Sequence, residues 1–415
     1  MSVLIKDVLL DGEETSIYVE ENTIRGIGSD AEADRTVDGR GKAAIPGMVN
    51  THTHAAMTLF RGYADDLRLQ EWLQEHIWPA EAKLTEEDVY WGTRLACLEM
   101  VKTGTTCFND MYWHLKGAVK AVEDSGIRGV LNSVFIDKFN KEDAKKQRKQ
   151  AEKEMKDVKA CSRVTLALGP HAIYTVTEES LQWAREYSDK HDVLVHFHLS
   201  ETAKEVEDCK EETGMRPVEY LDSIGFLGPN LVCAHCVWLD DREIRLMGES
   251  GVKVSHCPTS NMKLSVGEAL DYEKLKHAGV CVSLGTDGCA SNNTLDMFES
   301  MKNAALLQKI WYGDPTRLPA GEAFRMGTSE GAKALKLDTG AIEEGRLADI
   351  VLVDLKRPEL TPHHNLVSDL VYSASGGCVD TVICDGEVIM ENGRVDGEEE
   401  VMEKAEEIVG DLFSR

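Results

Sequence analysis

The sequence predicts an α/β protein that consists of a parallel (β/α)8 barrel and a small composite β-sandwich built from both chain ends. From residue 48 to about residue 340, apolar strand-like segments alternate with helical patterns, which is typical of parallel βα units. Both chain ends instead show short strands separated by turns. At 415 residues the chain is longer than a bare barrel of roughly 250 residues, so an accessory unit is expected.

The two chain ends read as pieces of one β unit. Short strands are predicted at residues 3–5, 16–19 and 23–27, and turn pairs such as Asp11-Gly12 separate them. Similar strands are predicted at 350–353 and 379–390, followed by an amphipathic helix over 398–412. Neither piece alone could bury its apolar face. We therefore predict one composite β-sandwich with a C-terminal helix from residues 1–47 and 346–415, and a barrel from residues 48–345.

Within the barrel region, eight apolar segments are predicted to be strands. We expect them to end near His54, Asn109, Phe135, Pro170, His198, His235, His256 and Asp287. Residues 141–159 are dense in charge. Because Glu and Asp are interleaved with Lys in this segment, a solvated outer helix is favoured over a basic binding face.

Composition narrows the classes of partner. The net charge is -27, from 46 Lys and Arg against 73 Asp and Glu, and such a charge disfavours nucleic acid and anionic membranes as partners. No apolar run is long enough for a membrane span. Eleven scattered cysteines and the lack of a basic-then-apolar leader favour a reduced, cytoplasmic setting. We expect a small-molecule substrate, and a homo-oligomer stays open.

The pattern Thr51-His52-Thr53-His54 follows the apolar run 43–49. Alternate residues of a strand share a face, so His52 and His54 could bind one metal ion together. Alone this pattern is a weak signal. It gains weight from other polar residues at predicted strand ends, namely His171, His198, His235, His256 and Asp287. A parallel barrel brings such ends to one mouth, and imidazoles with one carboxylate there indicate a catalytic transition-metal site.

The segment 193–198 carries two histidines on one face of a predicted strand. Only His198, at the carboxyl end, is expected to reach the mouth, so we predict it as a ligand and His196 as an interior histidine of a lower layer. Glu201 follows three residues later and is predicted to shuttle protons rather than to bind the metal.

Two further motifs have competing interpretations. Cys233 and Cys236 could form a redox pair or half of a structural zinc site, but without a second Cys pair at suitable spacing core packing is favoured. Asp287-Gly288 could be a plain turn, although a carboxylate after the last barrel strand is well placed as a metal ligand or base.

A set of motifs across the chain resembles the amidohydrolase superfamily in its mononuclear aminohydrolase branch. The motifs are PGMVNTHTH, GPHAIYT, HFHLSET, AHC, HCPTSNMKL and LGTDGCASNN, together with TLFRGYADDL and GRLADIVLVDL. Within that branch they are most similar to the 5-methylthioadenosine/S-adenosylhomocysteine deaminase family and the related 5'-deoxyadenosine deaminases.

The resemblance implies a deformed (β/α)8 TIM barrel with a β-sandwich and one divalent metal ion, usually zinc, although such ligands also accept iron or manganese. It implies metal ligands, proton-transfer residues and substrate contacts. The ligands would be His52, His54, His198 and Asp287; the catalytic residues Glu201, His235 and Asp287; the substrate contacts Glu81, His171, Glu201 and Asp287. His235 would orient the attacking water, Glu201 would protonate the purine ring and Glu81 would bind the ribose hydroxyls.

The implied reaction is hydrolytic deamination of 5'-substituted adenosines at C6, giving the inosine analogue and ammonia, as in the salvage of S-adenosylmethionine by-products. The cytidine-deaminase pattern H-x-E with P-C-x-x-C is absent from the sequence. Two alternatives remain. One is a sibling activity on a free purine or triazine, for which a ribose-binding Glu81 would have no purpose. The other is a non-catalytic scaffold, which predicts missing ligands, whereas every predicted ligand is present.

The sequence departs from some relatives at positions around the substrate. Ser133 stands where some members carry a substrate-binding arginine, and a second such arginine falls in the Lys-rich segment after Asn140. Trp238 and Cys257 replace a histidine and an asparagine of many relatives. A carboxylate on the 5' substituent would therefore lack a clear arginine partner, although Arg61 stays open as one.

Overall fold

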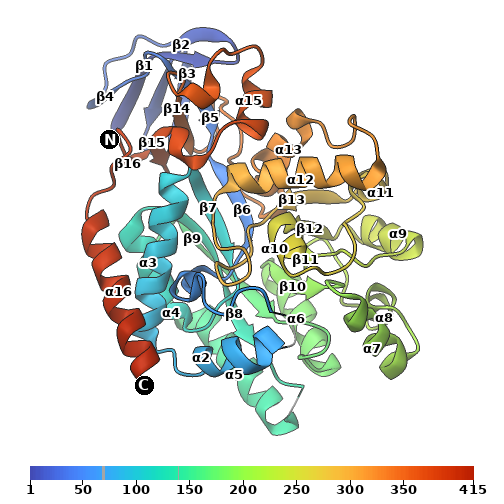
Figure 1. The fold of residues 1–415 in the computed structure, drawn as a ribbon. Coiled ribbons are helices and arrows are strands. Elements are labelled where there is room, and N and C mark those ends of the chain that lie inside the picture. Colours follow the sequence, from blue (N-terminus) through green and yellow to red (C-terminus); the bar gives the residue numbers. More distant parts are fainter. Residues whose placement is uncertain (68–70, 139) are drawn as a thin grey trace.

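The computed structural model describes residues 1–67, 71–138 and 140–415. Its centre is a parallel sheet of eight strands in the order β13-β12-β11-β10-β9-β8-β7-β6. The strands are β6 (Met48–Thr53), β7 (Thr105–Asp110), β8 (Arg128–Phe135), β9 (Val164–Pro170), β10 (Val195–Leu199), β11 (Leu231–His235), β12 (Lys253–His256) and β13 (Cys281–Leu284). They curve around a common axis (Figure 1), which confirms the predicted (β/α)8 barrel.

The first and last strands of the barrel meet through both side-chain and backbone hydrogen bonds. The Thr51 hydroxyl lies 2.9 Å from Ser283 Oγ and donates to Leu284 O over 2.9 Å, and the Asp287 N–H donates to His52 O over 3.0 Å. Gly285 permits this approach, because a Cβ there would stand 2.7 Å from the Cβ of His52. The meeting of β6 and β13 thus brings two residues far apart in sequence to the same point of the mouth.

Helices and short helical turns surround the barrel (Figure 1). They are η1 (Ala55–Phe60), η2 (Trp72–Ile77), α2 (Trp78–Glu81), α3 (Glu86–Lys102), α4 (Leu115–Ser125), α5 (Lys141–Asp157), α6 (Glu178–His191), α7 (Ala203–Thr213), α8 (Pro217–Ser223), α9 (Asp241–Ser250), α10 (Pro258–Lys263), α11 (Tyr272–His277), α12 (Met297–Tyr312), α13 (Ala320–Met326) and α14 (Ser329–Ala334). The charged segment predicted as an outer helix forms α5.

A second, mixed sheet combines the two chain ends. Its order is β16-β15-β14-β5-β1-β2-β3, with β4 on β1. Its strands are β1 (Ser2–Leu10), β2 (Glu13–Glu20), β3 (Thr23–Ile27), β4 (Arg35–Asp38), β5 (Lys42–Pro46), β14 (Ile350–Asp354), β15 (Val379–Cys384) and β16 (Glu387–Met390). Pairing of β14 with β5 joins the two ends, so the predicted composite β unit is present as one mixed sheet.

The remaining elements follow β14. They are η3 (Pro358–Leu360), α15 (Leu366–Tyr372), η4 (Gly376–Cys378) and α16 (Glu398–Ser414). The helix predicted at 398–412 is α16; it begins beside β16 and packs along α3 of the barrel (Figure 1). The domain boundaries at 47/48 and 345/346 stay a prediction.

The buried Arg128 guanidinium connects the barrel to the mixed sheet. Its Nε and one Nη donate to Asp349 over 3.2 Å each, and the same Nη donates to Asp385 over 2.9 Å. Because a buried charge needs paired, hydrogen-bonded partners, this triad fixes the seam between the two units.

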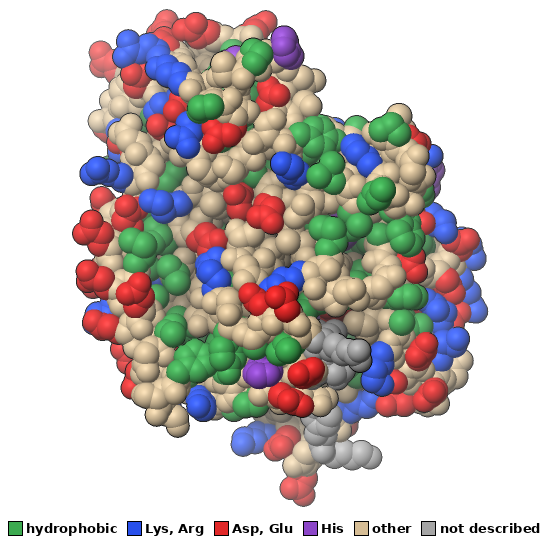
Figure 2. Space-filling model, in the orientation of Figure 1, with side chains coloured by type: hydrophobic (Ala, Val, Ile, Leu, Met, Phe, Trp, Pro, Cys, Tyr) green, Lys and Arg blue, Asp and Glu red, His purple; other side chains and the backbone are tan. Residues whose placement is uncertain are grey.

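On the face shown in Figure 2, acidic and basic side chains are interspersed. Among the described residues, no helix combines the length and the apolar character that a membrane crossing requires. All eleven cysteines are free thiols, Cys233 and Cys236 included.

Candidate metal centre and active site

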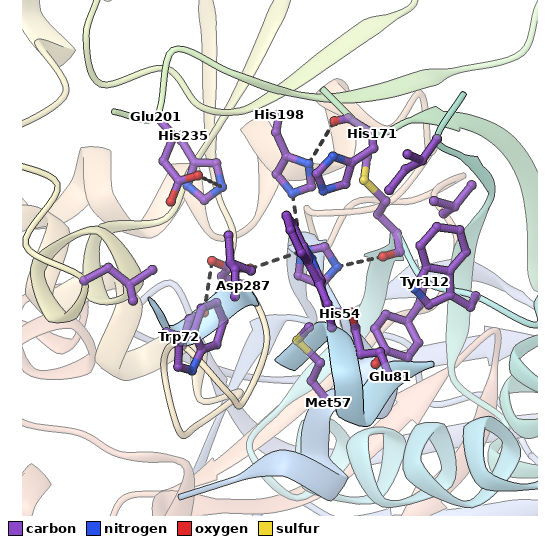
Figure 3. Close-up of a pocket in the computed structure, with 18 of the residues that line it drawn as sticks. His54, Met57, Trp72, Glu81, Tyr112, His171, His198, Glu201, His235 and Asp287 are labelled. Carbon is purple, nitrogen blue, oxygen red and sulfur yellow. Dashed lines mark hydrogen bonds and ion pairs between the residues drawn. The ribbon is translucent and has the colours of Figure 1, made fainter. Parts of the chain in front are cut away.

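Four predicted ligands converge at the mouth of the barrel. His52 and His54 come from β6 and the residue after it, His198 from β10, and Asp287 from the loop after β13. The Nε2 atoms of His54 and His198 lie 3.3 Å apart. Asp287 Oδ1 lies 3.4 Å from Nε2 of His54 (Figure 3) and 3.4 Å from Nε2 of His52. Four donor atoms from three elements therefore face one point.

The Nδ1 atom of each of these three histidines makes a hydrogen bond. His54 Nδ1 donates to Met111 O over 2.7 Å, and His198 Nδ1 donates to His171 O over 2.9 Å. A carbonyl oxygen can only accept, so the proton sits on Nδ1 and the Nε2 lone pair is left for a ligand. Such outer hydrogen bonds orient metal-binding imidazoles and raise their basicity.

His52 is oriented by a second histidine. His196 donates from Nδ1 to Val232 O over 2.9 Å, and its Nε2 lies 2.7 Å from Nδ1 of His52. Since His196 Nδ1 carries the proton, its Nε2 accepts from His52. His196 is buried, as predicted for an interior histidine, but sequence reasoning did not foresee that it contacts a predicted ligand. The available signal was its position on the same strand face as His198.

The donor set fits a divalent metal ion. His52 Nε2 is buried and has no hydrogen-bond partner among the described residues. The ligand atoms of His52, His54 and His198, and those of His52, His235 and Asp287, each lie within 4.8 Å of one another. Burial lowers the pKa of His52 to about 4 and that of His198 well below its usual range, so both rings are neutral, as metal ligands must be.

Asp287 is fixed by three donors. Its Oδ2 accepts from the Ser260 hydroxyl over 2.6 Å and from the Ser291 hydroxyl over 3.1 Å, while Oδ1 accepts from the Gly288 N–H over 2.8 Å. The backbone of Asp287 is left-handed, with φ of 65°, a strained conformation that clusters at functional sites.

Glu201 and His235 form the other edge of the group. Glu201 Oε2 lies 3.9 Å from His235 Nε2 (Figure 3), and His235 Nδ1 donates to Asn261 Oδ1 over 3.0 Å. Burial raises the pKa of the Glu201 carboxyl. Burial lowers the pKa of His235, but the charges of Glu201 and Asp287 outweigh burial, so this pKa is raised above its usual value. Asn261 lies within the motif HCPTSNMKL, but its role in orienting His235 follows only from the structure.

The predicted substrate contacts Glu81 and His171 line the same pocket as three of the predicted ligands, His54, His198 and Asp287. The four predicted ligands, these three and His52, are called the metal-binding group below. Glu81 stands at the end of α2, and His171 follows β9 (Figure 3). Burial raises the pKa of Glu81, while the nearby Tyr112 hydroxyl acts in the opposite direction. This hydroxyl is buried and makes no hydrogen bond of good geometry to the described residues. Glu81 and Tyr112 thus lie side by side at this end of the pocket.

Several aromatic residues of the pocket were not foreseen from sequence. They are Trp72, Trp78, Tyr112, Trp113 and Tyr174. Glu81, Trp78 and Trp113 also line an adjoining recess. The other residues of this recess are Ala82, Leu84, His114, Ile136 and Thr175. The described lining of this recess contains no Lys or Arg. Apolar contact therefore dominates the part of the site beyond the predicted ribose-binding carboxylate.

Comparison with known proteins decides the family. Residues 43–389 match the amidohydrolase family. This chain belongs to that family. It is 51% identical over 399 residues to 5-methylthioadenosine/S-adenosylhomocysteine deaminase 1 of Archaeoglobus fulgidus, covering 95% of this chain and 94% of the relative. It is 50% identical to a 5'-deoxyadenosine deaminase of Methanoregula boonei, covering 97% and 93%.

Solved structures agree with the fold. The crystal structure of an adenosine deaminase from Xanthomonas campestris with bound zinc superposes with a TM-score of 0.92 at 34% identity, covering 100% of this chain and 99% of the other. An atrazine chlorohydrolase from Arthrobacter aurescens superposes with a TM-score of 0.88 at 22% identity, covering 98% and 100%. The amidohydrolase chain described here is thus a hydrolase with a TIM barrel, as the motifs implied.

Proposed function

We propose that this amidohydrolase is a metal-dependent deaminase that converts 5'-substituted adenosines to the inosine analogue and ammonia. The observation that carries the proposal is one pocket that joins the metal-binding group and Glu201 to Glu81. The relatives named above support it, since both are named as deaminases of adenosine derivatives. Eleven free thiols support a reducing, cytoplasmic setting.

Each side chain has a role that follows from its surroundings. His52, His54, His198 and Asp287 would hold the ion, for which we propose zinc. When bound, such an ion acts as a Lewis acid and makes water a nucleophile near neutral pH. Glu201, whose pKa is raised by burial, would donate a proton to N1 of the purine. Asp287, whose carboxylate accepts hydrogen bonds from Ser260 and Ser291, would accept a proton from the attacking water while His235 orients that water.

The far end of the pocket supports a preference among substrates. Glu81 would accept hydrogen bonds from the ribose hydroxyls, so the 5' group would lie toward the adjoining recess. That recess suits a 5'-deoxy or 5'-methylthio group better than the charged amino-acid tail of S-adenosylhomocysteine. Arg61, left open from sequence as an anion contact, is paired with Glu99 and the Asn293 carbonyl and does not line the pocket.

The test is ammonia release from a panel of adenosine, 2'-deoxyadenosine, 5'-deoxyadenosine, methylthioadenosine, S-adenosylhomocysteine and guanine. We expect 5'-deoxyadenosine and methylthioadenosine to give the highest kcat/KM, and S-adenosylhomocysteine to give a kcat/KM no higher than theirs. The kcat/KM for 2'-deoxyadenosine should be sharply lower than that for adenosine, because Glu81 would lose a hydrogen-bond donor. Release from guanine alone would refute the proposal. A kcat/KM for S-adenosylhomocysteine well above that for 5'-deoxyadenosine would refute the substrate ranking.

A further inference from the structure

Glu205 is a buried carboxylate close to the active site that the proposed chemistry does not use. It lies in the first turn of α7 and is 6% exposed. Oε1 accepts from the Ser200 N–H over 2.7 Å, and Oε2 accepts from the Glu201 N–H over 2.8 Å. Both oxygens are therefore committed to the backbone of the loop that carries Glu201.

This arrangement is not an ordinary helix cap. A glutamate at the third helical position usually bonds the N–H of the N-cap residue, as Glu243 of α9 does with Asp240 over 3.0 Å. In α7 the N-cap is Thr202, whose hydroxyl accepts from the Glu205 N–H over 3.2 Å. Glu205 reaches past this residue to the two before it. Its carboxylate therefore binds the loop before the helix, at Ser200 and Glu201, instead of the N–H of the N-cap residue.

The same loop is held from the opposite side by the chain after β11. Leu199 O accepts from the Cys236 N–H over 2.9 Å, and Ser200 O accepts from the Trp238 N–H over 2.8 Å. Ser200 itself has φ of 49°, a left-handed conformation that persists only when the surroundings impose it. The loop between His198 and Glu201 is thus clamped between Glu205 and the strand that ends at His235.

We propose that Glu205 is a positioning residue for Glu201, which it holds beside His235 by binding two successive backbone N–H groups. The inference rests on the proposed function, in which Glu201 transfers the proton. A carboxylate offers an acceptor to each N–H, whereas glutamine would present an amide N–H₂ to one of them. Removal of one acceptor leaves a buried donor unpaired and frees the loop to shift.

The experiment compares Glu205→Gln with Glu243→Gln in the metal-loaded enzyme. We expect Glu205→Gln to lower kcat about tenfold or more, with KM within about threefold, because small displacements of catalytic groups are costly. The bound metal should be unchanged. Glu243 is also buried and also accepts two backbone N–H groups, from Asp240 and Val218, but it lies away from the pocket. Glu243→Gln should lower the Tm and leave kcat near that of the wild type.

A double-mutant cycle separates positioning from stability. If Glu205 acts through Glu201, then Glu205→Gln should cost almost nothing further in a Glu201→Gln background. An additive loss, an unchanged kcat in Glu205→Gln, or loss of metal in that variant would overturn the inference. Glu205→Asp keeps the charge but shortens the reach, so a smaller loss than in Glu205→Gln is expected. Misfolding of both variants would show a purely structural role.

Amide hydrogen exchange tests the same idea without any substrate. The Ser200 and Glu201 N–H groups should be protected in the wild type and lose protection selectively in Glu205→Gln. This measurement stays informative if no adenosine derivative is deaminated, so failure of the proposed function and failure of the Glu205 inference give different results. Unchanged protection of both amides would contradict the inference.

Discussion

The two ends of the pocket are built in different ways. At the metal-binding end, side chains come from strand ends or the loops directly after them, and His52, His54, His198 and His235 each have one ring nitrogen fixed by a hydrogen bond. At the other end, Trp72, Trp78 and Glu81 come from the short helical segments η2 and α2, and Trp78 is 40% exposed. The residues proposed for the chemistry thus come from strand ends, and those proposed for substrate choice come from helical segments outside the barrel.

This difference has a physical cause. A strand end in a parallel barrel is held by hydrogen bonds to both neighbours, so its side chains point to one mouth with little freedom. A helical segment between strands can change in sequence without disturbing the barrel. Substitutions at the metal-binding end should therefore abolish or slow turnover, and substitutions at the far end should change substrate preference.

The largest effect is expected from the metal-binding group. Chelation should abolish activity, and one divalent ion per chain should restore it. Asp287→Ala should abolish turnover even at saturating metal, because the water also loses its base. Elemental analysis and ammonia release check both statements. Two catalytic ions per chain, or activity in a metal-free preparation, would contradict the proposed site with a single metal ion.

The next largest effect concerns Glu201. Glu201→Gln should keep the bound metal and substrate affinity but lower kcat by about 10²-fold or more, the usual scale of general acid-base catalysis. Elemental analysis, KM and kcat separate the two roles. Loss of metal in this variant would mean that Glu201 is itself a ligand.

A smaller effect is expected from His196, which lies behind the predicted ligand His52. His196→Phe should weaken metal affinity by about 10- to 100-fold, the usual cost of removing an outer partner of a metal ligand, while restored metal should recover most of kcat. Competition with a chelator measures the affinity. If only the Tm falls and metal affinity is unchanged, His196 is an ordinary interior histidine.

The smallest effect belongs to the far end of the pocket. Trp113→Ala should lower kcat/KM for methylthioadenosine about tenfold relative to adenosine, because apolar contact with the 5' group is lost, and leave kcat for adenosine within about threefold. Trp311, which is 45% exposed on α12, provides the control Trp311→Ala. Equal losses for both substrates would show that Trp113 does not face the 5' group.

Sequence patterns predicted the barrel well because apolar strands alternate with helices at regular spacing. The ends of β8 and β9 fall at Phe135 and Pro170 as predicted, whereas β13 ends at Leu284, three residues before the predicted Asp287. The four predicted ligands meet because strand-end position and side-chain alternation are local properties of sequence. Their roles in this chain stay a prediction.

What sequence could not supply were contacts between distant strands. The bond between His52 and His196 joins residues 144 positions apart, and it depends on how the layers inside the barrel pack. Glu205 could be recognised as an early helical glutamate, but its choice of Ser200 and Glu201 depends on the path of the loop. Tyr112 and Trp113 follow β7, yet only the folded chain shows that they line the same pocket as Glu81.

The pairing of β5 with β14 has a consequence for synthesis of the chain. β5 runs almost directly into β6, which carries His52 and His54, but its partner strand pairs Pro46 with Ile350, about 300 residues later. At about 5–20 residues per second, a ribosome needs roughly 15–60 s between the two segments. During that interval the first two predicted ligands, His52 and His54, stand beside an unpaired strand edge. Messages truncated before β14 would therefore yield chains with an exposed edge, which are candidates for aggregation and proteolysis.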